Sequence, residues 1–153
     1  MLPKPQSALL FLAASSIAAE AHAVRPLPGQ WQQTIVIEVV DDETHEYTKL
    51  SEKTRTVCLS AEALSEPPLG PERVVRAGGT CDPVESKISP ELGSELWRIS
   101  CQTPEGKKHR MVSEVTYTES SMRSVLHSIS EHQGEVVEGK VTTESKRVGA
   151  CTP

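Results

Sequence analysis

Apolar and polar residues alternate along much of the chain, in short runs that end at turn residues. The clearest runs cover residues 31–40 and 109–118, where apolar side chains recur at every second position. A period of two is typical of β-strands that bury one face. Weaker alternation of the same kind predicts further strands over residues 47–59, 73–76, 81–88, 95–101, 122–130 and 135–148.

The spacing of these runs predicts the fold class. Hairpin-length turns separate the predicted strands, and no helical period extends beyond about two turns. Ser60 is placed to cap a short helix, which Pro67 and Pro68 would end. We therefore expect a single all-β domain: an antiparallel meander of about seven or eight strands, in a strongly curved sheet or a partly closed barrel, with one short helix near residues 60–65.

The N-terminal residues have the pattern of a secretory signal peptide. Lys4 precedes an apolar run over residues 8–19, and Ala21-His22-Ala23 forms a small-x-small cleavage site. We expect cleavage after Ala23, so that residues 24–153 form the exported domain in the periplasm or outside the cell. No apolar run in the sequence reaches the roughly 18 residues of a membrane span, so no transmembrane segment is expected.

The cysteine pattern predicts two disulfides. An even number of cysteines in an exported chain is typical of a disulfide framework. Three pairings are possible, and a turn at residues 90–93 would place Cys81 opposite Cys101 on paired strands. Cys58 would then pair with Cys151. The spacing lacks the paired C-x-x-C pattern of a zinc site, so no metal is expected.

The two strands of this hairpin differ in their alternation. Val84 and Ile88 lie on the opposite parity from Cys81, whereas Trp97 shares the parity of Cys101. A bulge near Pro83 would bring the apolar side chains of both strands onto one face.

Composition limits the partners of the chain. The formal net charge is −5 and aromatic residues make up 3% of the sequence. An acidic chain lacks the basic surface of a nucleic-acid-binding protein. Its few large side chains give a lean core, which disulfides would help to stabilise.

Three short strings occur in order along the chain: PGQW at 28–31, TVCLS at 56–60 and KRVGAC at 146–151. Together with the cysteine spacing, they resemble the bacterial exported family known as domain of unknown function 3617. The resemblance covers nearly the whole predicted mature chain. It implies an exported all-β domain and assigns no activity and no catalytic residue.

Residue types that carry catalysis or bind metals form no recognised motif here. The chain has neither a G-x-S-x-G elbow nor a phosphate-binding glycine loop. His109 and His127 would come close only if their strands pair, with an offset of about three positions. His45 lies in an acidic turn with Asp41, which is typical of a solvated loop. We expect no enzymatic activity and no cofactor; a hydrolase whose serine, histidine and carboxylate are assembled by the fold is a further alternative.

A curved sheet with one apolar face suits a small apolar ligand. We therefore expect a monomeric, non-enzymatic binding module. Its candidate lining residues are Trp31, Ile35, Ile37, Val115, Tyr117, Val125 and Val141. The alternative is that these side chains form a solid core and that the protein acts in the cell envelope, where residues 47–56 would form an edge strand that pairs with a partner protein.

Overall fold

The computed structural model describes residues 23–41, 43–66 and 72–151, so the predicted signal peptide lies outside the described residues except for Ala23. None of the helices in these ranges has the length and apolar composition of a membrane span. The elements are β1 (Gly29–Val40), β2 (Tyr47–Leu59), α1 (Ala61–Ser65), α2 (Glu72–Arg76), β3 (Thr80–Cys81), β4 (Glu85–Ser89), the 3-10 helix η1 (Pro90–Leu92), β5 (Ser94–Gln102), β6 (Lys108–Tyr117), β7 (Ser121–His132) and β8 (Glu135–Gly149).

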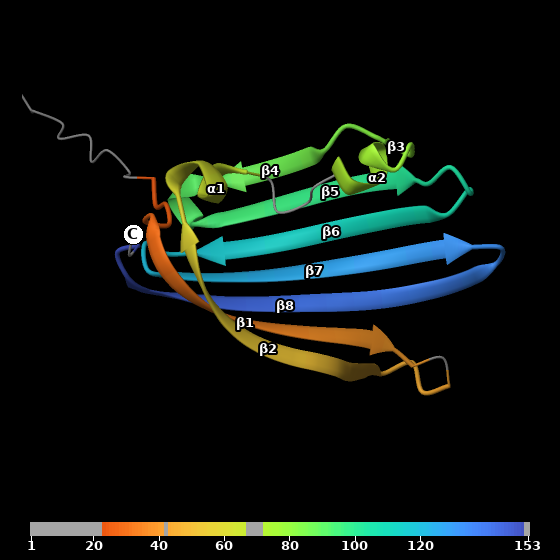
Figure 1. Cartoon of the computed structure of the whole chain (residues 1–153), viewed down its shortest axis with the longest axis horizontal. Helices are drawn as coiled ribbons and strands as arrows, with labels where there is room; N and C mark the ends of the chain where they lie inside the picture. The colour runs from red at the N-terminus through yellow and green to blue at the C-terminus, as the bar shows by residue number, and fades with distance from the viewer. Residues whose placement is uncertain (1–22, 42, 67–71, 152–153) are drawn as a thin grey trace, which may run out of the picture.

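The strands of the described chain form one eight-stranded antiparallel sheet, as the alternation predicts (Figure 1). Its order is β2-β1-β8-β7-β6-β5-β3, and β4 also pairs with β5. Strands β4 to β8 form the expected meander. The first strand, however, pairs with the last, so β1 and β8 are neighbours inside the sheet. The sheet does not close into a barrel, because β2 lies at one edge and β3 and β4 lie at the other.

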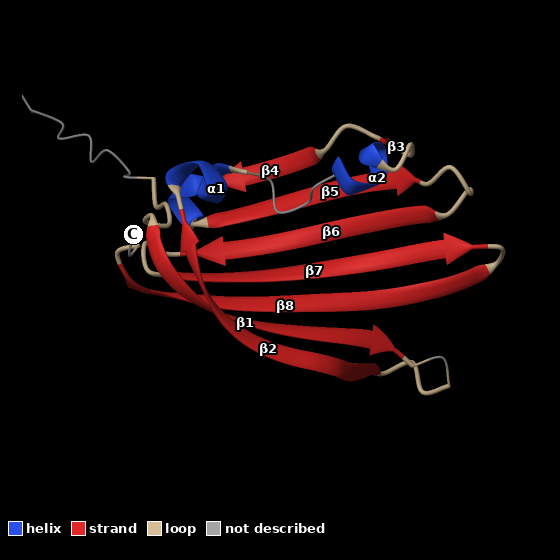
Figure 2. Cartoon of the chain, viewed as in Figure 1, coloured by secondary structure: helices blue, strands red, loops and turns tan. Residues whose placement is uncertain are grey.

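The strand register defines two faces. Ile35, Thr143, Ser124, Val115 and Glu95 lie opposite one another on β1, β8, β7, β6 and β5. Because side chains alternate along each strand, these five share one face. Both helices lie on this side, which we call the covered face, and Figure 2 shows them at opposite ends of the β4–β5 edge. The other side is called the open face.

The hairpin β4–β5 has the predicted register. Cys81 lies opposite Cys101 and forms a disulfide with it. Glu85 lies opposite Arg98 on β5. Between the pair Cys81–Cys101 and the pair Glu85–Arg98, the three residues 82–84 therefore face only two residues of β5, 99 and 100. The extra residue is the predicted bulge near Pro83, which brings Ile88 onto the same face as Trp97.

Residues 73–76 form a helix, so the strand predicted there is wrong and the chain has a second short helix. Gly78 has a φ of 85° and donates its N–H to the carbonyl of Val75 at 2.9 Å. Gly79 donates to the carbonyl of Val74 at 2.9 Å. This is the Schellman arrangement that ends a helix at a glycine. Gly78 and Gly79 therefore end a helix.

The core of the covered face is small. It consists of Trp97, Ile99, Cys101, Val115 and Tyr117, with Val74 of α2 and Val24 packed against it. The disulfide Cys81–Cys101 is therefore part of the core, as a lean composition leads one to expect.

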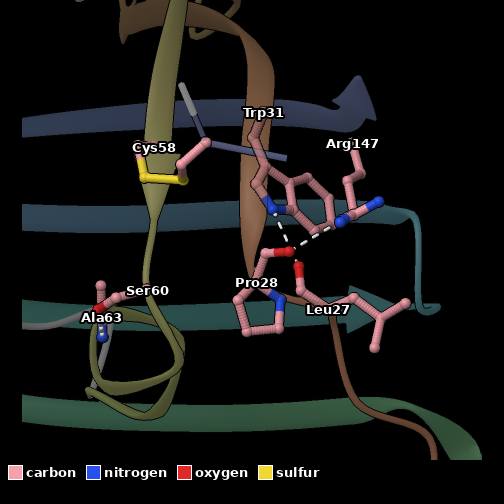
Figure 3. Close-up of a disulfide and its surroundings, with 8 residues drawn as sticks. Leu27, Pro28, Trp31, Cys58, Ser60, Ala63 and Arg147 are labelled. Carbon is pink, nitrogen blue, oxygen red and sulfur yellow. Dashed lines mark hydrogen bonds between the residues drawn. A yellow bond between two sulfur atoms is a disulfide. The ribbon is translucent and has the colours of Figure 1, made fainter. Parts of the chain in front are cut away.

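A second buried region lies at one end of the sheet, where β1 meets β8. Trp31 is fully buried there, with 0% of its surface exposed, and its indole N–H donates to the carbonyl of Leu27 at 3.2 Å. Arg147 lies opposite Trp31 and donates from Nε to the carbonyl of Pro28 at 3.0 Å (Figure 3). The residues of the PGQW string thus pack at the end of the sheet where β1 meets β8.

The backbone conformation at position 29 explains why the PGQW string has a glycine there. Its φ is 150°, a conformation that favours glycine, and a Cβ there would clash with the carbonyl oxygen of Gly149. We predict that Gly29→Ala lowers the free energy of unfolding by more than about 1 kcal/mol in urea denaturation.

Gly149 provides the matched control on the facing strand, because a Cβ at that position meets nothing within 4 Å. Gly149→Ala should stay within about 0.5 kcal/mol of the wild type. Equal stability of both variants would contradict the close approach of β1 and β8 at this end.

Candidate functional site

Two adjoining pockets lie between α1 and the covered face. Their volumes are about 240 and about 230 Å³, and they share Pro26, Leu64, Glu95 and Tyr117 in their walls. The first pocket is further lined by apolar side chains that include Ile88 and Trp97. Concave sites with apolar walls and few polar groups are typical of small-molecule binding. We call these two pockets together the α1 site.

Helix α1 forms the roof of the α1 site, and its position follows from the residues before it. Ser60 caps the helix, since its Oγ accepts the N–H of Ala63 at 3.2 Å. Cys58, two residues earlier at the end of β2, is joined to Cys151 by the second predicted disulfide (Figure 3). The bridge fixes the end of β2 to the end of the chain, and thereby holds the start of α1 over the sheet.

The N-terminal segment forms one side wall. Val24 donates its backbone N–H to the carbonyl of Pro90 at 3.1 Å, and Leu27 donates to that of Glu119 at 3.0 Å. These bonds fix the segment at both ends of Pro26, which lines both pockets. The wall is therefore attached to two separate turns of the sheet.

The polar centre of the α1 site is Glu95 on β5. The indole N–H of Trp97 donates to Oε2 of Glu95 at 2.9 Å. The hydroxyl of Tyr117 is also hydrogen-bonded to Glu95. Glu95 is half-buried, whereas both aromatic side chains are only 9% exposed. A carboxylate thus lies between two aromatic side chains at the point where the pockets meet.

This environment changes the pKa of Tyr117. Burial raises the pKa of Tyr117 above its usual value, and the negative charge of Glu95 and its hydrogen bond raise it further. The positive charge of Arg25 acts in the opposite direction. A raised pKa keeps the phenol protonated at neutral pH, so Tyr117 remains a donor toward Glu95.

Several other polar side chains at the site are hydrogen-bonded within the protein. Gln33 accepts the Nε–H of Arg55 at 3.1 Å, and its amide donates to the hydroxyl of Ser145 at 3.4 Å. Ser124 is within 3.4 Å of the hydroxyl of Ser113. Among the described lining residues of the α1 site there is no histidine, cysteine or lysine. The paired polar groups at its centre are the carboxylate of Glu95 and the hydroxyl of Tyr117.

The structure separates the seven predicted lining residues into three groups. Val115 and Tyr117 line the α1 site. Four others lie on the covered face but do not line these two pockets: Trp31, Ile35, Ile37 and Val141. Val125 lies opposite Glu114 and Thr142, which places it on the open face. The expectation that Val125 shares a face with Val115 is therefore wrong, because Val115 lies opposite Ser124 instead.

Sequence reasoning missed Glu95, Leu64 and Pro26. One signal for Glu95 was present, since Trp97, Ile99 and Cys101 continue its alternation on β5 and are all buried. An acidic residue at a position of core parity is unusual enough to indicate a site. Nothing in the sequence placed Leu64 or Pro26 next to it, because both reach the sheet through long-range contacts.

The histidines and the acidic turn lie elsewhere. His109 lies opposite Ser130 and His127 opposite Val112, so their strands pair with the expected offset of three, but the two side chains are on opposite faces. Burial lowers the pKa of His109 and the charge of Lys107 lowers it further. No group of three potential metal ligands is brought together within the described ranges.

In the acidic turn, the carboxylate of Asp41 stabilises the backbone of the turn. Oδ1 of Asp41 accepts the backbone N–H groups of Glu43 and Thr44 at 3.0 and 2.9 Å. The bond from Thr44 is the main cause that lowers the pKa of Asp41. This is the Asx-type turn of a solvated loop.

Comparison with known proteins gives one match. The family described as "Protein of unknown function (DUF3617)" matches residues 26–151. The matched span includes both disulfides and every strand of the described sheet. Neither the curated proteins nor the solved structures yield a match to this chain. The chain belongs to the DUF3617 family.

Proposed function

We propose that this protein is an exported, non-enzymatic binding module that holds a small apolar ligand in the α1 site. The observation that carries the proposal is the pair of adjoining pockets beneath α1. Proline, leucine, isoleucine and aromatic side chains form most of the first pocket. An apolar ligand would gain about 25 cal/mol for each Å² of apolar surface that it buries there.

The architecture suits reversible binding better than catalysis. The roof is a five-residue helix that contains no buried residue, so few packing contacts hold it on the sheet. The residues that flank this helix, Ser60 and Glu66, both have extended backbone conformations. The disulfide at Cys58 holds the start of the roof against the end of the chain. A ligand could therefore enter without disruption of the sheet.

Ala63 provides a test of the site, because it lines the pocket next to Val115. We predict that Ala63→Phe fills this space and weakens the binding of N-phenylnaphthylamine, a neutral apolar dye, by at least about tenfold in a fluorescence titration. The wild-type protein should bind the dye with a rise in dye fluorescence.

Glu62 is the matched control. It lies on the same helix, is exposed and does not line either pocket. Glu62→Phe should bind the dye within about twofold of the wild type, and circular dichroism of both variants checks the fold. Wild-type affinity in Ala63→Phe, or absence of binding to the wild type, would refute the proposal.

Export is part of the proposed function. Cys58–Cys151 and Cys81–Cys101 are bonds that persist in oxidising compartments and are rare in the cytosol. Val24, the first residue after the predicted cleavage site, is already attached to the sheet through Pro90. A mature chain that begins at Val24 would therefore retain all the described walls of the α1 site.

The mass of the protein tests export directly. When the full chain is expressed in a bacterium, we expect the periplasmic fraction to contain a protein with Val24 as its first residue. Its mass without reduction should be about four hydrogens below that of the reduced chain, because two disulfides form. An uncleaved, reduced chain confined to the cytosol would contradict this prediction.

A second candidate function is protein interaction in the cell envelope. β2 is an edge strand, and nearly all of its residues are exposed. An extended segment of a partner could add to such an edge through backbone hydrogen bonds. The charged residues of β2, among them Lys49 and Glu52, also protect an edge from unwanted pairing, so this function ranks second.

A further inference from the structure

We propose that the ligand of the α1 site is an amphiphile with a protonated amine as its head group, bound by the carboxylate of Glu95. This inference rests on the proposed function and adds the chemical class of the ligand. The apolar tail lies beneath Leu64, next to Pro26. The ammonium group lies at Glu95, which belongs to both pockets.

Glu95 occupies a position of β5 whose side chain faces the core. The next residues of the same alternation on β5, Trp97 and Ile99, are 9% and 3% exposed. A carboxylate at such a position loses hydration, which is costly unless hydrogen-bond donors or a cation replace the water. Two donors are present, from Trp97 and Tyr117. A carboxylate has about four acceptor positions, so Glu95 retains capacity for donors of a ligand.

Both hydrogen-bond partners of Glu95 are aromatic side chains. Trp97 and Tyr117 line the first pocket together with Glu95. Both donate hydrogen bonds to Glu95 and hold its carboxylate at the apolar wall of the pocket. A carboxylate held there favours an ammonium group over a neutral hydroxyl, because opposite charges attract more strongly where water is partly excluded. It disfavours a carboxylate, which would meet the negative charge of Glu95 at close range.

Negative charge predominates around the α1 site. The charged residues among the described walls of the α1 site are Glu95, Glu66 and Arg25. Arg25 is exposed, whereas Glu95 is half-buried. Glu91 contributes a further negative charge that acts on Tyr117. The site is therefore acidic overall, and its most buried charge is negative.

Three probes with the same tail and different heads test this inference by isothermal titration calorimetry: decylamine, decanol and decanoate. Near pH 7 the amine is protonated and the acid is ionised. We expect decylamine to bind the wild type at least about tenfold more tightly than decanol, and decanoate to bind most weakly. High salt should reduce the preference for decylamine over decanol.

Glu95→Gln keeps the shape of the side chain and an oxygen that can accept the N–H of Trp97. It should lose affinity for decylamine, so that the preference for decylamine over decanol falls to about twofold or less. Glu91→Gln, a change outside the pocket walls, should retain the preference.

The outcomes separate the two claims. Similar affinity of the wild type for all three probes would overturn the amine inference and leave the binding function intact. If the wild type binds none of the three probes, both the amine inference and the binding function are overturned. If Glu95→Gln does not fold, the order of the three affinities in the wild type and its dependence on salt still decide the question.

Discussion

The pairing of β1 with β8 is the constraint on which the rest of this structure depends. It places the first and the last strand side by side inside the sheet, so that Gly29 comes against Gly149 and Trp31 lies opposite Arg147. Only with this pairing in place can Cys58 on β2 reach Cys151 after β8. The β1–β8 pairs and the disulfide all join residues that lie more than 90 positions apart in the sequence. The two cysteines of the disulfide are 93 positions apart. A cross-link of that length removes much of the conformational freedom of the unfolded chain.

The same constraint positions the candidate site. β2 leads directly through Ser60 into α1, so the bridge at Cys58 also determines where the roof of the α1 site begins. The N-terminal segment, held between Trp31 and Pro90, supplies the side wall. The pockets thus arise where the two ends of the chain meet the meander. The polar pair Glu95 and Tyr117 comes from the meander itself, where β5 and β6 form an ordinary hairpin.

Local patterns allowed much of the fold to be predicted. The turn after Ile88 and the parity of Trp97 were sufficient to predict both the disulfide Cys81–Cys101 and the bulge near Pro83, since hairpin register follows from nearby residues. The pairing of the first strand with the last was beyond such reasoning, although the disulfide Cys58–Cys151 was predicted. Val125 and Leu126 are adjacent and both apolar, so the sequence does not show which of the two lies on the covered face. The register of β7 with β6 shows that it is Leu126.

The candidate site was predicted less well, for a physical reason. Hydrophobic alternation identifies residues that are buried, and Val115 and Tyr117 were found in this way. It cannot tell a packed side chain such as Trp31 from one that borders a pocket, because both are apolar and both face inward. Glu95 interrupts the alternation, and such an interruption was the stronger signal of a site.

The most direct test of the central claim, that the α1 site holds a small molecule, is the native mass of the protein purified from the periplasm without detergent. The native mass is compared with the mass of the same sample after denaturation without reduction. The account predicts a monomer that carries an additional small-molecule mass, which is lost on denaturation. Identical native and denatured masses would contradict it.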